Sequence, residues 1–213
     1  MRFDRLLHSV WDLPMVESCV LRVLLSADPK SLSVQLDRWV KAGKMIKLRR
    51  GAYVLPEELR RTSAPIEHVA NLLVSPSYIT AQRALALHGL IPEGVAVVQS
   101  ATVGRSREVT TPIGVFSYLH VRSAWFFGYE ETEVGGGRAL VALPHKALLD
   151  LIHLSRGEFS EARISELRLQ DLGRMDFGAL ARDARRSGSP RLVRAAKRVV
   201  ALAQRATVGE VEL

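Results

Sequence analysis

A run of cations without an acid lies near the N-terminus of the 213-residue chain. Positions 38–50 read RWVKAGKMIKLRR and hold six Lys and Arg residues but no Asp or Glu. These cations are Arg38, Lys41, Lys44, Lys47, Arg49 and Arg50. Solvated protein surfaces normally mix both signs of charge, and Lys and Arg are the side chains that bind phosphate. The segment therefore predicts a phosphate backbone as its partner.

The charge distribution along the chain supports a polyanionic partner. The formal net charge is +8, and residues 1–63 hold 12 Lys and Arg against 7 Asp and Glu. Residues 64–155 hold 6 against 7, and residues 156–213 hold 12 against 8. Positive charge is thus concentrated at the two ends, which favours nucleic-acid binding over a role in general solubility.

The first cations lie on a predicted helix whose two ends are marked. Ser31 is a suitable N-cap, and Gly43 stands where a left-handed residue would end the helix. Leu32, Leu36 and Trp39 share one face at helical spacing and are expected in the core. The opposite face is exposed and, apart from one aspartate, carries no acid.

The segments around this helix predict a winged helix-turn-helix over residues 1–60. Upstream, LPMV reads as a short strand and ESCVLRVLL as a helix. Downstream, KMIKLRR and AYVL read as two strands joined at Arg49, Arg50 and Gly51. Strand, helix, capped helix and hairpin occur in the order of that motif.

The rest of the chain predicts a mixed α/β domain over residues 64–205 that ends in basic helices, so the fold class is α+β. Residues 57–65, EELRRTSAP, form the expected linker. Short helices are predicted at IEHVANLL and after Thr80, β-rich segments follow, and Pro144 opens a further helix. Lys146 and Asp150 lie four residues apart and can pair on that helix.

In a major groove, the outward face of the Ser31 helix would meet base edges, while the hairpin would hold phosphates. The residues predicted to contact DNA are Ser31, Ser33, Val34, Gln35, Arg38, Lys41, Lys44, Lys47, Arg49 and Arg50. The competing interpretation is that these lysines only solubilise an exposed edge. The coincidence of a capped helix, a hairpin and an acid-free cluster favours DNA.

Two longer blocks carry a family resemblance. The first is SLSVQLDRWVKAGKMIKLRRGAYVLP, and the second runs from SPSYITAQRALALHGLIPE through TPIGVFSYLHV and WFFGYE to ALPHKALLDLIHL. Together they resemble the AbiEi family, the antitoxin and transcriptional regulator of type IV (AbiE) toxin–antitoxin systems. The resemblance implies a winged helix that binds inverted repeats in its own promoter and represses the operon. It also implies a C-terminal domain that counters a co-encoded nucleotidyltransferase toxin. Inverted repeats suit two copies bound side by side, but the sequence shows no heptad or dimer helix, so we expect a monomer in solution that binds DNA cooperatively.

A second set of cations is a candidate surface for the toxin or for nucleic acid. Its members are Arg105, Arg107, Arg182, Arg185, Arg186, Arg191, Arg194, Lys197 and Arg198. The first two are expected to flank a hairpin turn, and the others lie on predicted C-terminal helices. A solvated helix remains the alternative for the latter. In a rival function, this tail binds toxin or tRNA and DNA binding is nonspecific.

Motifs for catalysis, metal binding and export are missing from the sequence. The only D/E-x-K is Asp28-Pro29-Lys30, and there is no P-loop, nucleotidyltransferase D-x-D or nucleophile elbow. Six scattered histidines and the single Cys19 give no metal-ligand spacing. No apolar run has the length of a membrane span, and no signal peptide is evident. We therefore expect a cytoplasmic protein that is not an enzyme and needs no metal or cofactor.

Overall fold

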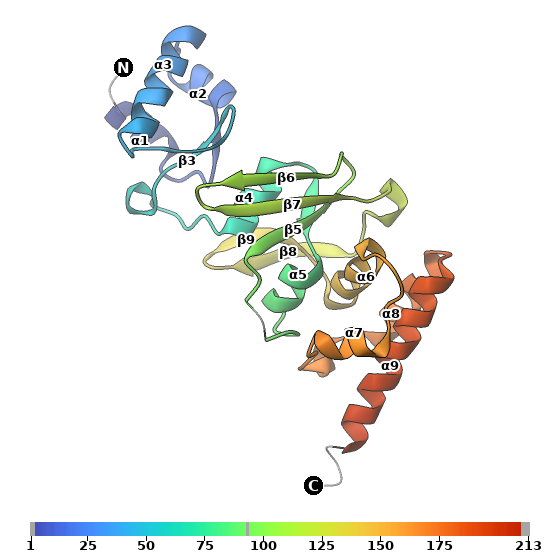
Figure 1. The fold of residues 1–213 in the computed structure, drawn as a ribbon. Coiled ribbons are helices and arrows are strands. Elements are labelled where there is room, and N and C mark those ends of the chain that lie inside the picture. Colours follow the sequence, from blue (N-terminus) through green and yellow to red (C-terminus); the bar gives the residue numbers. More distant parts are fainter. Residues whose placement is uncertain (1–2, 93, 210–213) are drawn as a thin grey trace.

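The computed structural model describes residues 3–92 and 94–209. Within these residues, the protein is a mixed α+β structure with nine α-helices and two β-sheets (Figure 1). The first three helices and a small sheet lie at one end, a larger sheet lies in the middle, and the last helices lie at the opposite end. The α+β class predicted from the sequence is therefore confirmed.

The N-terminal part contains every expected element and one additional helix. In chain order its elements are α1 (Phe3–Val10), β1 (Val16–Glu17), α2 (Ser18–Leu24), α3 (Pro29–Lys41), β2 (Ile46–Arg49) and β3 (Ala52–Val54). The three strands form an antiparallel sheet in the order β1-β3-β2. Helix α1 was not expected; its Leu6 and Val10 are buried beneath α3 in one hydrophobic cluster with Trp39.

Strand β3 of the small sheet is buried on both faces and contributes to two hydrophobic cores. Tyr53 belongs to the core formed with α1, α2 and α3. Leu48, Ala52 and Val54 belong instead to the core of the larger, C-terminal part. Because side chains alternate between the faces of a strand, one short strand serves both cores. The β2–β3 hairpin is consequently packed against the second half of the molecule and is not a free ribbon.

The larger sheet has six strands in the order β6-β7-β5-β4-β9-β8. The strands are β4 (Ser77–Ile79), β5 (Val97–Thr102), β6 (Arg107–Thr111), β7 (Gly114–His120), β8 (Tyr129–Val134) and β9 (Gly137–Ala142). The pairs β5–β7 and β4–β9 are parallel, and the other pairs are antiparallel. Helices α4 (Ile66–Leu73), α5 (Ala81–Leu87) and α6 (Pro144–Leu154) pack against it.

Three α-helices complete the C-terminal part: α7 (Glu161–Glu166), α8 (Phe177–Arg186) and α9 (Pro190–Gly209). The last two form a helical hairpin that turns at Gly188, where φ is +67°. Short 3₁₀ turns lie at Glu57–Leu59, Ser123–Trp125 and Leu172–Arg174. The first of these turns lies inside the predicted linker, which is therefore partly ordered.

Candidate nucleic-acid interface

Helix α3 begins three residues earlier than the sequence suggested. Asp28 is the N-cap, and its carboxylate accepts the Ser31 backbone N–H at 3.0 Å. Pro29 occupies the first turn, where its missing N–H costs nothing. The prediction that Ser31 caps the helix is therefore wrong, and Ser31 is an exposed residue in the first turn. The predicted end is confirmed, because Gly43 follows the helix with φ +69°.

Trp39 packs the inner face of α3 into the N-terminal core, as predicted. The ring of Phe3 packs edge-on against it, with 5.5 Å between the ring centroids. Leu32, Leu36 and Trp39 are all buried. The face of α3 opposite this stripe is exposed, and Val34 keeps 53% of its surface accessible.

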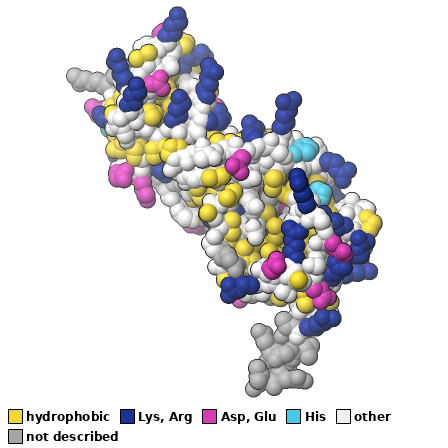
Figure 2. All heavy atoms as spheres, viewed as in Figure 1, with side chains coloured by type: hydrophobic (Ala, Val, Ile, Leu, Met, Phe, Trp, Pro, Cys, Tyr) yellow, Lys and Arg dark blue, Asp and Glu magenta, His cyan; other side chains and the backbone are white. Residues whose placement is uncertain are grey.

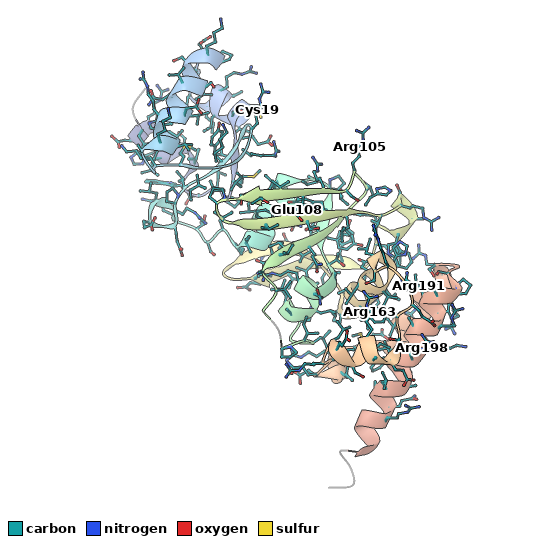
Figure 3. All side chains as sticks on the ribbon, viewed as in Figure 1. Cys19, Arg105, Glu108, Arg163, Arg191 and Arg198 are labelled. Atoms are coloured by element: carbon teal, nitrogen blue, oxygen red, sulfur yellow. The ribbon has the colours of Figure 1, made fainter. Side chains whose placement is uncertain are left out.

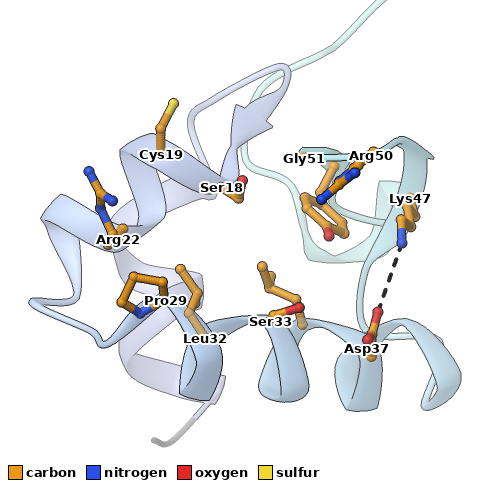
Figure 4. A pocket seen from close by; sticks show the side chains of 12 residues that line it. Ser18, Cys19, Arg22, Pro29, Leu32, Ser33, Asp37, Lys47, Arg50 and Gly51 are labelled. Atoms are coloured by element: carbon orange, nitrogen blue, oxygen red, sulfur yellow. Dashed lines mark ion pairs between the residues drawn. The ribbon is translucent and has the colours of Figure 1, made fainter.

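A groove of about 500 Å³ lies between α2, the first half of α3 and the β2–β3 turn (Figure 4). Its lining residues are Ser18, Cys19, Arg22, Pro29, Leu32, Ser33, Leu36, Asp37, Lys47, Arg50, Gly51 and Tyr53. Of the predicted DNA contacts, the structure brings Ser33, Lys47 and Arg50 together here. The groove thus combines a helix face with two cations of the hairpin.

The charged side chains that line the groove are three cations and one acid, Asp37. Arg22, Lys47 and Arg50 are exposed, and the Lys47 ammonium lies 3.9 Å from the Asp37 carboxylate. Both partners of this ion pair are about half exposed, so the pair contributes little to stability. Burial, and secondarily Asp37, raises the pKa of the Tyr53 hydroxyl, which therefore stays protonated and can donate a hydrogen bond.

Arg22 is a groove cation that the sequence analysis missed. It lies on α2, outside the acid-free run, and its side chain lines the groove together with Cys19 from the preceding turn. The two residues are three apart, the spacing that places side chains on one helix face. That spacing was visible in the sequence, but only the fold shows that this face borders α3.

Several predicted contacts of α3 lie outside the groove. Ser31, Gln35 and Arg38 follow one another at helical spacing along a different stripe from Pro29, Ser33 and Asp37. None of these three residues lines the groove. They form a second flank of the same helix, and Gln35 is only half-exposed.

Two further lysines lie at the C-terminal end of α3. Lys41 is exposed in its last turn. The Lys44 ammonium lies 5.1 Å from the centre of the Phe3 ring, in a cation–π contact. Lys44 therefore has a structural contact in addition to its exposed position.

Arg49 points away from the groove. A β-bulge between Lys47 and Arg49 shifts the register, so that Arg49 lies opposite Ala52. Its guanidinium donates to Glu17 Oε1 at 3.0 Å and to the Leu73 carbonyl at 3.4 Å. Arg49 thereby connects the hairpin to β1 and α4, although it remains partly exposed.

The prediction that Arg105 and Arg107 flank a hairpin turn is wrong. The loop that holds Arg105 joins β5 to β6, and these strands do not pair because β7 lies between them. The hairpin is instead β6–β7, with its turn at residues 112–113. Both arginines are exposed, and Figure 3 shows Arg105 projecting from the end of the sheet. Arg107 also lines a cavity beside Arg49.

The cations of α8 and α9 divide into two groups. Arg191 donates to the Ser155 and Gly157 carbonyls, and Arg198 donates to the Phe159 carbonyl and pairs with Glu158 (Figure 3). Arg186 stacks over the Phe127 ring at 4.5 Å. The exposed members, for which no such contact exists among the described residues, are Arg182, Arg185, Arg194 and Lys197. Only the second group presents free positive charge.

The predicted Lys146–Asp150 pair exists, but it is completely buried. Asp150 also accepts hydrogen bonds from the Tyr78 and Thr80 hydroxyls at 2.9 and 2.7 Å and from the Trp125 indole at 2.6 Å. Thr80 stands at the N-cap of α5 as expected, yet its hydroxyl serves this network and not the helix. Lys146, Asp150, Tyr78 and Thr80 are all fully buried, so the network lies inside the core.

The comparisons with protein families and with curated proteins identify no relative of this chain. The chain matches no protein-family model, and no curated protein matches it. In the part of the chain that the structure describes, no helix has both the length and the apolar character needed to cross a membrane. In the same residues, no group of three or more His, Cys, Asp or Glu side chains is placed to hold a metal ion.

Proposed function

We propose that the chain is a sequence-specific DNA-binding repressor whose N-terminal part is a winged helix-turn-helix. The order α1, β1, α2, α3, β2, β3 and the sheet order β1-β3-β2 support this proposal, because that motif sets a recognition helix beside a hairpin. The observation that carries it is the groove in which Ser33 of α3, Arg22 of α2 and the hairpin cations Lys47 and Arg50 converge.

In this proposal, the parts of the surface have different tasks. Ser33 and Val34 on α3 meet base edges in the major groove, where hydrogen bonds and apolar contacts read the sequence. Arg22, Lys47 and Arg50 hold phosphates, which positions the protein without reading sequence. Figure 2 shows Lys and Arg side chains projecting over the N-terminal part.

The biological role that we propose is that of an AbiEi-type antitoxin. The protein would bind inverted repeats in its own promoter and repress its operon, and its C-terminal domain would counter a co-encoded nucleotidyltransferase toxin. The sequence blocks described above support this role. A second candidate is favoured by four exposed cations of α8 and α9, namely Arg182, Arg185, Arg194 and Lys197. It is a module whose basic tail binds toxin or tRNA while DNA binding is nonspecific.

Fluorescence anisotropy with two labelled duplexes tests the proposal. One duplex is the DNA upstream of the protein's own gene, and the other is a scrambled duplex of equal length. We expect tighter binding to the upstream duplex and a steep loss of affinity as salt is raised, since phosphate contacts release counterions. Lys47→Glu/Arg50→Glu should remove this binding. The control Arg122→Glu/Arg156→Glu changes the net charge equally, far from the groove, and should retain it.

Equal weak binding to both duplexes would contradict a sequence-specific repressor. If binding to the upstream duplex survived Lys47→Glu/Arg50→Glu unchanged, the interface would be misplaced. If the parent protein then bound a tRNA more tightly than either duplex, the second candidate function would be favoured.

A further inference from the structure

An apolar groove runs between α8 and α9, at the end of the molecule opposite the N-terminal helices (Figure 1). It consists of a cavity of about 340 Å³ and an adjoining one of about 380 Å³, which share Arg185 and Val193. The apolar residues that line it are Ala181, Ala184, Val193, Ala196, Val200 and Ala201. Four of these six are alanines, so another backbone can approach closely.

Cations alone mark the charged rim of this groove. Arg185 lines both cavities, Lys197 lines the first and Arg194 lines the second. Within residues 3–92 and 94–209, no acidic residue lines either cavity. Among the described residues, these three side chains make no hydrogen bond or ion pair, in contrast to Arg191 and Arg198 on the same helix. The rim therefore offers three cations that form no ion pair within the described residues, although Arg194 is close enough to Glu158 to lower the pKa of that carboxylate.

We propose that this groove binds an amphipathic helix of a partner protein whose flanks carry Glu or Asp. Its apolar stripe would cover the alanines and valines, and its acids would face Arg185, Arg194 and Lys197. The α9 residues that line the groove run from Pro190 to Gln204. At roughly 1.5 Å per residue this is about 21 Å, or four turns, so the occupant is a helix of about 14 residues.

The apolar floor distinguishes a protein partner from a nucleic acid. A phosphate backbone would satisfy the three cations but would lay charged oxygens over alanine and valine side chains, which removes water from the phosphates without replacing it. A helix with an apolar stripe and acidic flanks satisfies both parts of the groove at once. The inference is independent of the proposed DNA binding, because the two surfaces lie at opposite ends of the molecule.

A display library tests this proposal with the full chain as bait. The library holds 16-residue helical peptides in which one stripe varies between Leu and Ala and the flanking positions vary between Glu and Lys. We expect enrichment of peptides with a Leu stripe and Glu flanks. An enriched peptide, synthesised with a fluorescent label, should then bind the parent protein and bind Arg185→Glu/Lys197→Glu at least about ten-fold more weakly.

Two further variants and one competitor sharpen the test. Ala201→Gln places a longer polar side chain on the floor and should also weaken binding about ten-fold. Arg122→Glu/Arg156→Glu is the control of equal charge change and should bind like the parent. The proposal is wrong if no peptide is enriched, if the enriched flanks are Lys, or if Arg185→Glu/Lys197→Glu binds as the parent does. It is also wrong if an RNA stem-loop competes the peptide away and binds more tightly through the same cations.

Circular dichroism of each variant keeps these outcomes interpretable. Arg185, Lys197 and the two control residues are exposed, so their replacement should leave the thermal unfolding transition unchanged. The upstream-DNA affinity of Arg185→Glu/Lys197→Glu should also equal that of the parent. A loss there would mean that the two surfaces are not independent and that the charged rim serves DNA.

Discussion

The Arg49 guanidinium lies 3.0 Å from Glu17 Oε1 and 3.4 Å from the Leu73 carbonyl oxygen. These contacts link the last residue of β2 to β1 and to the end of α4. Arg49 thus belongs to the joint between the two hydrophobic cores, whereas its neighbour Arg50 lines the groove. Two adjacent arginines of one basic run consequently have different surroundings.

This difference predicts separable effects of two matched substitutions. Arg50→Met should weaken binding to the upstream duplex and lower the dependence of affinity on salt by about one phosphate contact. Arg49→Met should change DNA affinity much less. It should instead lower the free energy of unfolding by no more than about 1 kcal/mol, because the Glu17 pair is partly exposed.

Urea unfolding and anisotropy at several salt concentrations measure these effects. Glu17→Gln is the matched control for Arg49→Met, since it removes the other partner of the same pair and should lower stability similarly. Should Arg49→Met reduce DNA affinity as strongly as Arg50→Met, Arg49 would have to leave Glu17 to reach DNA.

Replacing Asp37 is predicted to raise the affinity for DNA, in contrast to the loss predicted for Arg50→Met. Asp37 is the only acid that lines the groove, and it lies 3.9 Å from the Lys47 ammonium. Asp37→Asn removes repulsion of phosphate and releases Lys47, so DNA affinity should rise about two- to five-fold, on the order of 0.5–1 kcal/mol. Anisotropy at low salt measures this gain. Asp12→Asn, an exposed acid outside the groove, should give none, and weaker binding by Asp37→Asn would contradict the groove as the DNA site.

Local signals in the sequence were sufficient for most elements. Gly43 ends α3 because glycine adopts positive φ without strain, and Pro144 opens α6 because the first turn needs no N–H. The start of α3 was misplaced because two adjacent capping signals compete. Asp28 with Pro29 prevails over Ser31 and lengthens the helix by three residues.

Nonlocal relationships could not be read from the sequence. The bulge in β2 turns Arg49 out of the groove, and a single extra residue in a strand leaves no distinct pattern in so short a segment. The pairing of β7 between β5 and β6 depends on contacts between distant segments. Arg22 joined the site only because α2 packs beside α3. Residue types therefore predicted which segments carry cations, and the fold determines which of these cations lie together in the groove.

The buried network around Asp150 predicts an asymmetry between its two charged members. Lys146→Met leaves the carboxylate with three donors, the hydroxyls of Tyr78 and Thr80 and the indole of Trp125. Asp150→Leu leaves a buried ammonium with only the Tyr78 hydroxyl as a hydrogen-bond partner. Removing one partner of a buried ion pair costs about 3–5 kcal/mol, and we expect Asp150→Leu to be the more damaging change.

Urea unfolding of the two single variants and of Lys146→Met/Asp150→Leu tests this order. The double variant carries no unpaired buried charge and should be more stable than Asp150→Leu alone. The burial of Lys146 lowers its pKa, which reduces the penalty of Asp150→Leu because the amine can lose its proton. The penalty should therefore be larger at pH 6 than at pH 9. Equal losses for both single variants at both pH values would contradict this account.

His145 predicts how stability depends on pH. Its Nε2 lies 3.3 Å from Asp183 Oδ2, and its side chain is nearly buried. Burial lowers the pKa of this imidazole more than Asp183 and Asp176 raise it, and Arg182 lowers it further. The ring is therefore neutral at pH 7 and donates Nε2–H to the carboxylate, which can only accept.

Because the folded pKa lies below the unfolded one, the unfolded chain binds more protons as the pH falls. The free energy of unfolding should consequently decrease from pH 7 toward pH 5, and the contribution of His145 is complete only above its unfolded pKa. His145→Gln should make this decrease shallower, whereas His8→Gln, at an exposed position, is the matched control. Urea unfolding at several pH values measures both slopes. A steeper decrease in His145→Gln than in the parent would mean that the Asp183 pair holds the imidazole charged and that burial is the smaller effect.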